Sequence, residues 1–247
     1  MMGKVIMSGI VPPLVAPITG ILASDLAVGS SVYLMEDGVA VEYLVVNHGK
    51  PSGSSLYDDS CDGTWLLRKD IKEARQWHSS AVNDYKNSTI HAWLNGDFFN
   101  LFGSIEKAAI KQSKIPYVNG TGSGGSVASG ANGLATKVFL LGGYEIGYTT
   151  STVGSTVPID GAKLDYFLEG AGSAAQKKRI AYLIGAALAW HTRSPWTNTT
   201  KSVWGAANDG GACGLNVNNS SAGIRPALIL PKNALFDTNT MLLKGVA

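Results

Sequence analysis

Strand patterns lie near both ends of this chain, and helix patterns are grouped between them. Residues 32–46 are rich in β-branched and aromatic side chains around Asp37-Gly38, which predicts a hairpin with a tight turn. Apolar runs predict further strands at 64–67, 137–141 and 227–230. This order of elements predicts an α+β fold, and the sequence contains no internal repeat.

Three helices are expected in the first half of the chain. Residues 70–78 carry helix-forming side chains, and residues 87–89 (Asn-Ser-Thr) can cap a helix that contains Ile90, Trp93 and Leu94. Ser104 is the expected N-cap of a helix over 105–111. The glycine- and serine-rich segment 120–133 is expected to be a surface loop.

Low charge restricts what this surface can bind. Only 15% of the 247 residues are charged, and 20 basic against 18 acidic side chains leave a net charge of +2. This balance excludes binding to nucleic acid or to an anionic membrane by charge alone. No uninterrupted apolar run of about 20 residues is present, so no membrane insertion is expected.

The chain is expected to hold one domain with two extensions. Residues 1–26 contain Pro12, Pro13 and Pro17, which break any helix, so this part is expected to be an extended leader that anchors the domain to a neighbouring subunit. The domain is expected to span residues 27–235. Residues 236–247 then form a C-terminal tail.

No residue pattern predicts a catalytic centre, a cofactor or a metal. Residues 120–125 match G-x-G-x-x-G, but another glycine-rich stretch follows them where a dinucleotide site needs a helix. The four histidines lack metal-ligand spacing, and no nucleophile–base arrangement is present. Asp160, Asp165 and Glu169 are expected on a solvated face. A glycan-cleaving enzyme stays an alternative only if two carboxylates meet in a concave pocket.

The two cysteines, Cys61 and Cys213, are too few for a disulfide framework. Free thiols are expected, although pairing in space stays open.

Residues 191–221 are the most informative segment. They include five asparagines, two tryptophans and only three charged side chains. Aromatic anchors among short polar groups are typical of antibody-like binding loops, because they give a large contact area at low entropic cost. The alternative is an ordinary glycine-rich loop whose tryptophans fold into the core. Composition alone does not choose between the two.

Two motifs frame this segment. Residues 190–195 (Trp-His-Thr-Arg-Ser-Pro), with Trp204 after them, and residues 223–228 (Gly-Ile-Arg-Pro-Ala-Leu) resemble the C-terminal half of C-type-lectin-like domains, as found in a widespread bacterial and prophage family. Blocks at 61–67, 110–117 and 139–145 are also similar to that family. The resemblance covers roughly residues 25–232.

The resemblance implies a fold with small twisted antiparallel sheets, two or three helices and a long irregular C-terminal binding region. Related phage tropism determinants and other variable proteins of diversity-generating retroelements vary their residues in this region. His191 and Thr192 stand where the family more often has Trp and Leu, which leaves open whether they belong to the scaffold or to the variable surface.

The function implied by the resemblance is recognition without catalysis. The protein is expected on a phage tail or virion, or else on a bacterial cell surface, as a homo-oligomer that binds a host-surface protein or glycan and contacts other virion subunits through its leader. Arg193, Ser194, Arg225 and Pro226 are expected to be scaffold. The expected contact residues are His191, Trp196, Thr197, Asn198, Lys201, Trp204, Asn208, Asp209, Leu215, Asn216 and Asn218.

A second hypothesis assigns no host ligand to the protein. It is then a structural virion component, such as a decoration or tail-assembly protein, whose loops contact only neighbouring subunits.

Overall fold

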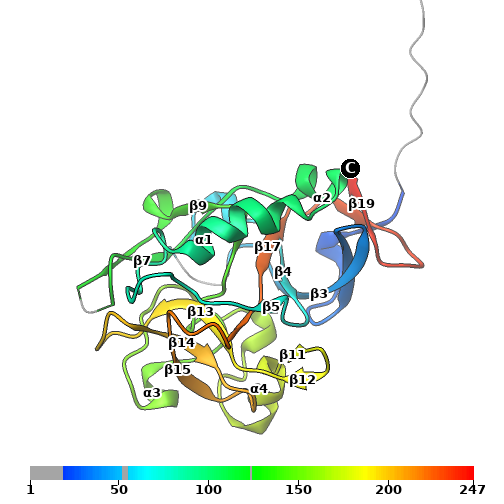
Figure 1. The fold of residues 1–247 in the computed structure, drawn as a ribbon. Coiled ribbons are helices and arrows are strands. Elements are labelled where there is room, and N and C mark those ends of the chain that lie inside the picture. Colours follow the sequence, from blue (N-terminus) through cyan, green and yellow to red (C-terminus); the bar gives the residue numbers. More distant parts are fainter. Residues whose placement is uncertain (1–18, 52–54, 123) are drawn as a thin grey trace, which may run out of the picture.

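Two five-stranded sheets form the centre of the molecule (Figure 1). The computed structural model describes residues 19–51, 55–122 and 124–247. The first sheet has the order β10-β17-β4-β3-β2, and its strands are β2 (Ser31–Glu36), β3 (Val39–His48), β4 (Thr64–Arg68), β10 (Val138–Phe139) and β17 (Ala227–Leu230). The second sheet has the order β15-β14-β13-β16-β5, and its strands are β5 (Glu73–Ala74), β13 (Trp190–Pro195), β14 (Ser202–Ala206), β15 (Ala212–Asn216) and β16 (Gly223–Ile224).

The expected hairpin joins β2 to β3 in an antiparallel pair. Asp37 and Gly38 have φ angles of +50° and +75°, so both central residues of the turn are left-handed. A turn of this kind matches the twist of the strands it connects, and aspartate and glycine adopt it at low cost. The strands expected at 64–67, 137–141 and 227–230 are confirmed as β4, β10 and β17, although β10 is shorter.

Four short helices occur in the described part of the chain. In α1 (Thr89–Trp93) the Ser88 side chain caps the first turn, as the sequence predicts, and a π-helical turn over Leu94–Phe98 continues it. The N-cap of α2 (Ser104–Ala109) is Gly103 rather than Ser104. The other two are α3 (Thr150–Val153) and α4 (Gly172–Arg179). The fold is therefore mixed and rich in sheet, in agreement with the α+β prediction.

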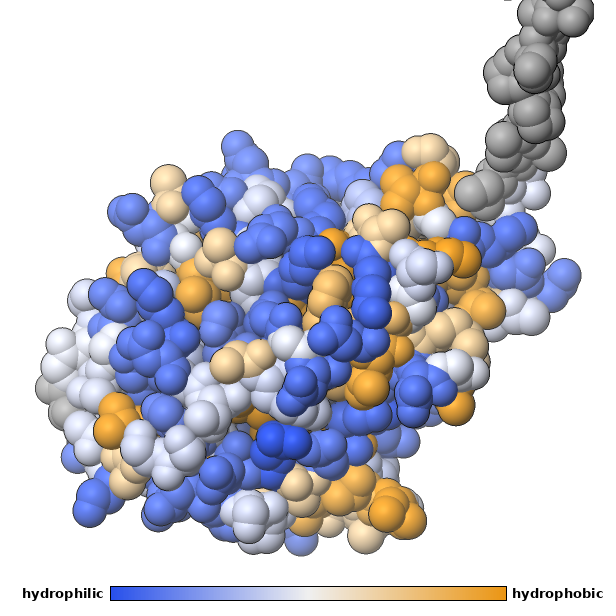
Figure 2. All heavy atoms as spheres, turned by 45° about the horizontal axis from the view of Figure 1, so that its top comes forward, coloured by the Kyte–Doolittle hydropathy of each residue, from blue (hydrophilic) through white to orange (hydrophobic). Residues whose placement is uncertain are grey.

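The helices divide between two sides of the molecule. In Figure 1, α1 and α2 lie on one side, and α3 and α4 lie on the opposite side, near β15. Figure 2 shows that the side with α1 and α2 is largely hydrophilic and is interrupted by small hydrophobic areas.

The two sheets are joined by two neighbouring crossings of the chain. β4 pairs with β17 in the first sheet. β5, which follows β4, pairs in the second sheet with β16, which precedes β17. At the crossing, the Arg68 N–H donates to the Pro226 carbonyl (2.9 Å) and Arg225 Nε donates to the Arg68 carbonyl (2.8 Å). The 223–228 motif therefore holds the two sheets together.

The prediction of a helix over residues 70–78 is wrong. The backbone there instead pairs with residues 222–224, which are distant in the sequence. The Lys72 N–H donates to the Ile224 carbonyl (2.9 Å), and the Arg75 N–H donates to the Ala222 carbonyl (3.0 Å). Helix propensity is a weak preference, and long-range pairing in the second sheet overrides it here.

Segment 120–133 is also more ordered than the expected loop. It contains β8 (Ser126–Ala128), which pairs with β7 (Tyr117–Asn119). The remaining short pairs are β6 (Ser113–Ile115) with β9 (Leu134–Thr136), and β11 (Tyr182–Leu183) with β12 (Ala186–Ala187).

The expected domain limits need correction at both ends. β1 (Ile21–Leu22) pairs with β18 (Ala234–Phe236), which pairs in turn with β19 (Leu243–Val246). Residues 19–26 and 236–247 therefore belong to the domain, because their backbones complete this three-stranded sheet. The first 18 residues of the predicted leader lie outside the described residues.

The core of the first sheet centres on Trp65. Its ring meets Tyr57 and Phe139 edge to face, each with 5.5 Å between ring centroids. Cys61 lies buried beside it, and both Cys61 and Cys213 are free thiols. No helix in the described residues is long and apolar enough to cross a membrane.

Candidate recognition surface

Two tryptophans organise the outer part of the second sheet. The Trp196 ring stacks on the Trp204 ring, with 4.2 Å between centroids and 15° between planes. Gly214 lies directly opposite Trp204 on β15. A Cβ atom at Gly214 would lie 2.6 Å from the Trp196 ring, so only glycine leaves room for this stack. The aromatic pair is therefore fixed by the register of β14 and β15.

A buried asparagine holds the loop that follows Trp196. The side-chain amide of Asn83 donates to the carbonyls of Trp196 (3.3 Å), Thr199 (2.8 Å) and Ser202 (2.7 Å). Its side-chain oxygen accepts the Gly122 N–H (3.0 Å). Asn83 is fully buried. Its bonds to loop 196–202 reach only main-chain carbonyl groups, so they fix the path of the loop backbone.

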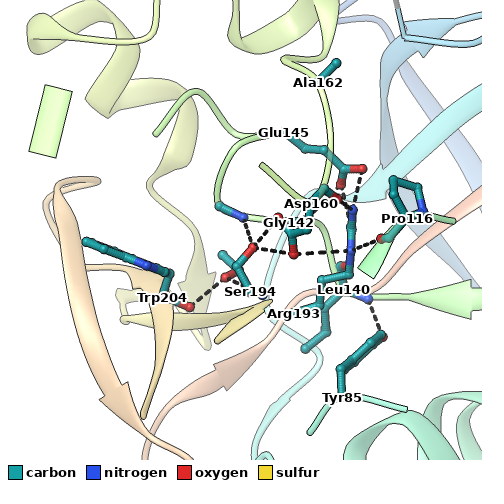
Figure 3. Close-up of polar contacts among 12 residues, drawn as sticks. Tyr85, Pro116, Leu140, Gly142, Glu145, Asp160, Ala162, Arg193, Ser194 and Trp204 are labelled. Carbon is teal, nitrogen blue, oxygen red and sulfur yellow. Dashed lines mark hydrogen bonds and ion pairs between the residues drawn. The ribbon is translucent and has the colours of Figure 1, made fainter. Parts of the chain in front are cut away.

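An ion pair lies beneath this surface (Figure 3). The Arg193 guanidinium bonds both oxygens of Glu145, at 2.6 and 2.7 Å, and both side chains are fully buried. Arg193 also donates to the carbonyls of Pro116 (2.9 Å), Leu140 (3.0 Å) and Asp160 (2.6 Å). Burial disfavours the arginine charge, but the Glu145 carboxylate outweighs this effect and raises the pKa of Arg193. These contacts agree with the prediction that Arg193 belongs to the scaffold.

Asp160 belongs to the same cluster, which corrects its expected place on a solvated face. It is fully buried, and its carboxylate accepts the Ser194 hydroxyl at 2.8 Å. The Ser194 oxygen accepts the Gly143 N–H (2.7 Å). Burial raises the pKa of Asp160 to about 6, although Arg193 and Ser194 act in the opposite direction. We call Glu145, Asp160, Arg193 and Ser194 the buried charge cluster.

The expected contact residues fall into three groups by exposure. His191 and Trp204 are buried. Three others are partly buried, namely Trp196, Thr197 and Leu215. Six are exposed, namely Asn198, Lys201, Asn208, Asp209, Asn216 and Asn218.

The burial of His191 and Trp204 corrects two of these expectations. His191 lies within β13, and burial lowers the pKa of its imidazole to about 4. Trp204 is covered by the Trp196 ring. Thr192 is buried as well, with its hydroxyl bonded to the Trp204 carbonyl (2.7 Å). His191 and Thr192 therefore belong to the scaffold, which answers the question left open by the sequence.

The exposed residues do not form one patch. Ser202 pairs with Asn216 at one end of the β14–β15 pair, and Ala206 pairs with Ala212 at the other. Asn198, Lys201 and Asn216 therefore gather at the loop 196–202 end, whereas Asn208 and Asp209 lie in the opposite turn. Strands rise about 3.3 Å per residue, so the two ends are about 13 Å apart.

The pairings that shape this surface gave no sequence signal. Asn83 lies more than 110 positions from the loop it holds, and Glu145 lies 48 positions from Arg193. Asn83 stands in no recognisable motif. Glu145 ends the block 139–145, but that block does not indicate that Glu145 pairs with Arg193. No group of three histidine, cysteine, aspartate or glutamate side chains in the described segments is arranged to hold a metal ion.

Residues 62–232 match a protein family described as a domain of unknown function, DUF6273. The match takes in about two thirds of the chain. The chain belongs to the DUF6273 family. Neither a curated protein nor a solved structure matches it. The DUF6273 match includes Asn83, the buried charge cluster and the whole second sheet, whereas the β2–β3 hairpin and the three-stranded sheet lie outside it.

Proposed function

We propose that this DUF6273 protein is a non-enzymatic recognition protein with a C-type-lectin-like fold, displayed on a phage tail or virion. Its binding face is loop 196–202 together with the adjoining end of β15, and its target is a host-surface protein or glycan. The observation that carries the proposal is a polar, partly exposed loop whose backbone is fixed from below by Asn83.

The chemistry of this end of the sheet suits recognition. The partly buried Trp196 ring offers apolar area and is held flat by Trp204. The exposed Asn198, Lys201 and Asn216 supply donors and acceptors around it. A loop that is already ordered loses little conformational entropy on binding, so weak individual contacts can add to useful affinity.

The fold assignment within this proposal rests on three features together. The sheets are small, the helices are short, and long irregular connections precede the C-terminal strands. The two motifs that resemble C-type-lectin-like domains also form adjacent buried strands, because β16 pairs with β13 in the second sheet. The second motif then continues into β17 of the first sheet. Several copies on one virion would convert weak contacts into avidity.

A cell-binding assay tests the proposed face. Labelled wild-type protein and the double variant Asn198→Ala/Lys201→Ala are mixed with a panel of bacterial strains, and the bound protein is measured. We expect the variant to lose at least ten-fold in bound protein on any strain that binds the wild type. The matched control, Asn100→Ala/Lys107→Ala, removes the same residue types beside α2 and should bind as the wild type does.

Two results would contradict the proposal. Equal binding by the two double variants would show that loop 196–202 does not contact the target. A reconstruction of the virion with loop 196–202 at a seam between subunits would favour the structural hypothesis instead.

A further inference from the structure

A cavity of about 300 Å³ is lined by residues of α3, of α4 and of the end of β15 that lies away from loop 196–202. Both helices lie on the same side of the molecule, near β15 (Figure 1). Sites of this volume lie at the lower end of the range for small-molecule ligands. The polar and glycine residues around it include Tyr148, Thr152, Gly170, Gly172, Gln176 and Arg179.

The wall of this cavity contains a buried positive charge. Arg179 is only 2% exposed, and its guanidinium donates to the carbonyls of Ile146 (2.8 Å), Gly210 (3.2 Å) and Gly170. The guanidinium carbon lies 4.5 Å from the centroid of the Tyr148 ring. These neutral groups orient the arginine, but they do not cancel its charge.

No carboxylate lies within salt-bridge distance of Arg179 among the residues that the structure describes. Two acidic side chains near the cavity are engaged elsewhere, since Glu169 pairs with Lys178 (2.6 Å) and Asp209 accepts the Gly211 N–H (2.8 Å). The contrast with Arg193 is direct, because that buried arginine has Glu145 as a bonded partner. Glu169 acts on Arg179 only from beyond salt-bridge distance, and burial still lowers the pKa of the arginine. A buried charge without a bonded counter-charge is costly, and an anion in the cavity would offset that cost.

The start of α4 adds a second attraction for an anion. Its N-cap is Ala171, which has no side-chain acceptor for the free N–H groups of the first turn. Those N–H groups carry the positive end of the helix dipole. Gly172, the next residue, has a φ of +85°, and the space beside its Cα is open. Ala171 and Gly172 both line the cavity, so the helix start and Arg179 face the same space.

We propose that this cavity binds the carboxylate of a small sugar acid. The carboxylate would lie between Arg179 and the start of α4, where both positive groups are within the same small volume. The Gln176 side-chain amide also lines the cavity and has a donor and an acceptor for sugar hydroxyls. This site is separate from loop 196–202 and does not depend on host binding.

Calorimetric titration with sodium glucuronate tests the site, with glucose as a neutral sugar of similar size. We expect glucuronate to bind at least ten-fold more tightly than glucose, and we expect added salt to weaken its binding. Equal affinity for the two sugars, or no heat from glucuronate, would overturn the proposal.

A variant that keeps the fold makes the test specific. Arg179 bonds three segments, and its replacement could unfold the domain. Ala171→Asp instead places a carboxylate at an N-cap with extended backbone (φ −127°, ψ 167°), where aspartate stabilises helices. The new side chain would bond the same N–H groups and repel the ligand, so glucuronate affinity should fall at least ten-fold while the melting temperature holds or rises.

The matched control is Ala108→Asp, which adds the same charge at an exposed position of α2, on the opposite side of the molecule and outside the cavity lining (Figure 1). It should bind glucuronate within about two-fold of the wild type. Unchanged affinity in Ala171→Asp, or an equal loss in both variants, would show that the start of α4 is not the anion site.

Discussion

The Trp196 ring lies flat on the Trp204 ring, 4.2 Å away, and Gly214 on the adjoining strand leaves the space that this stack occupies. One ring is buried and the other is partly exposed. The exposed ring therefore belongs to the surface, while its position is set by the core.

Replacement of Gly214 should disturb this pair. In Gly214→Ala the new Cβ would lie 2.6 Å from the Trp196 ring, so the ring must move off Trp204. We expect a loss of roughly 1–3 kcal/mol in the free energy of unfolding, as for other overpacked sites. Urea unfolding measures the loss, and tryptophan fluorescence reports the change in the stack. Gly124→Ala, which meets no atom within 4 Å, should leave both unchanged.

Removal of Glu145 should be strongly destabilising. In Glu145→Gln the buried Arg193 charge loses its only bidentate carboxylate partner among the described residues. Breaking a buried ion pair in this way costs about 3–5 kcal/mol. Chemical denaturation measures the cost. The exposed pair of Glu169 and Lys178 is the comparison, and Glu169→Gln should change stability little because solvent screens that pair.

Stability should depend on the protonation of His191. Burial lowers the folded-state pKa of His191 from 6.5 to about 4, so the unfolded chain binds the proton more readily between these values. Its contribution to stability is therefore fully present above pH 6.5 and is lost as the pH falls toward 4. Unfolding free energies measured across this range should fall more steeply for the wild type than for His191→Gln. Parallel curves would contradict the burial of the imidazole.

Truncation after Phe236 should damage the domain rather than remove a free tail. The deletion removes β19, which pairs with β18, and it also removes the buried Leu243. We expect a lower melting temperature and stronger binding of a dye that reports exposed apolar surface. A truncated protein that melts like the full chain would restore the tail expected from the sequence.

Local signals in the sequence predicted local structure well. The Asp37-Gly38 turn, the Ser88 cap and the strands β4 and β17 each depend on neighbouring residues, and each occurs as expected. The helix over residues 70–78 failed because its alternative, pairing with Ile224, is invisible in the local sequence.

The candidate surface could be predicted only as a region. Composition pointed to residues 191–221, but it did not say which side chains face outward. All six residues of β13 are buried, and the register shifts between His191 and Pro195, so simple alternation does not apply there. The partners below the surface, such as Asn83 and Glu145, come from distant segments, and no local pattern pairs them with the residues that they hold.

Asn83 holds loop 196–202 through three carbonyl groups, and every residue type has a carbonyl group. These three bonds do not depend on the identity of the loop side chains, although Thr199 Oγ1 also accepts the Lys201 N–H (3.1 Å). We expect that the exposed Asn198 and Lys201 can be exchanged for other residues while the main chain keeps its course. Such a loop is an evolvable part of the molecule, in which a change of specificity does not require a new fold.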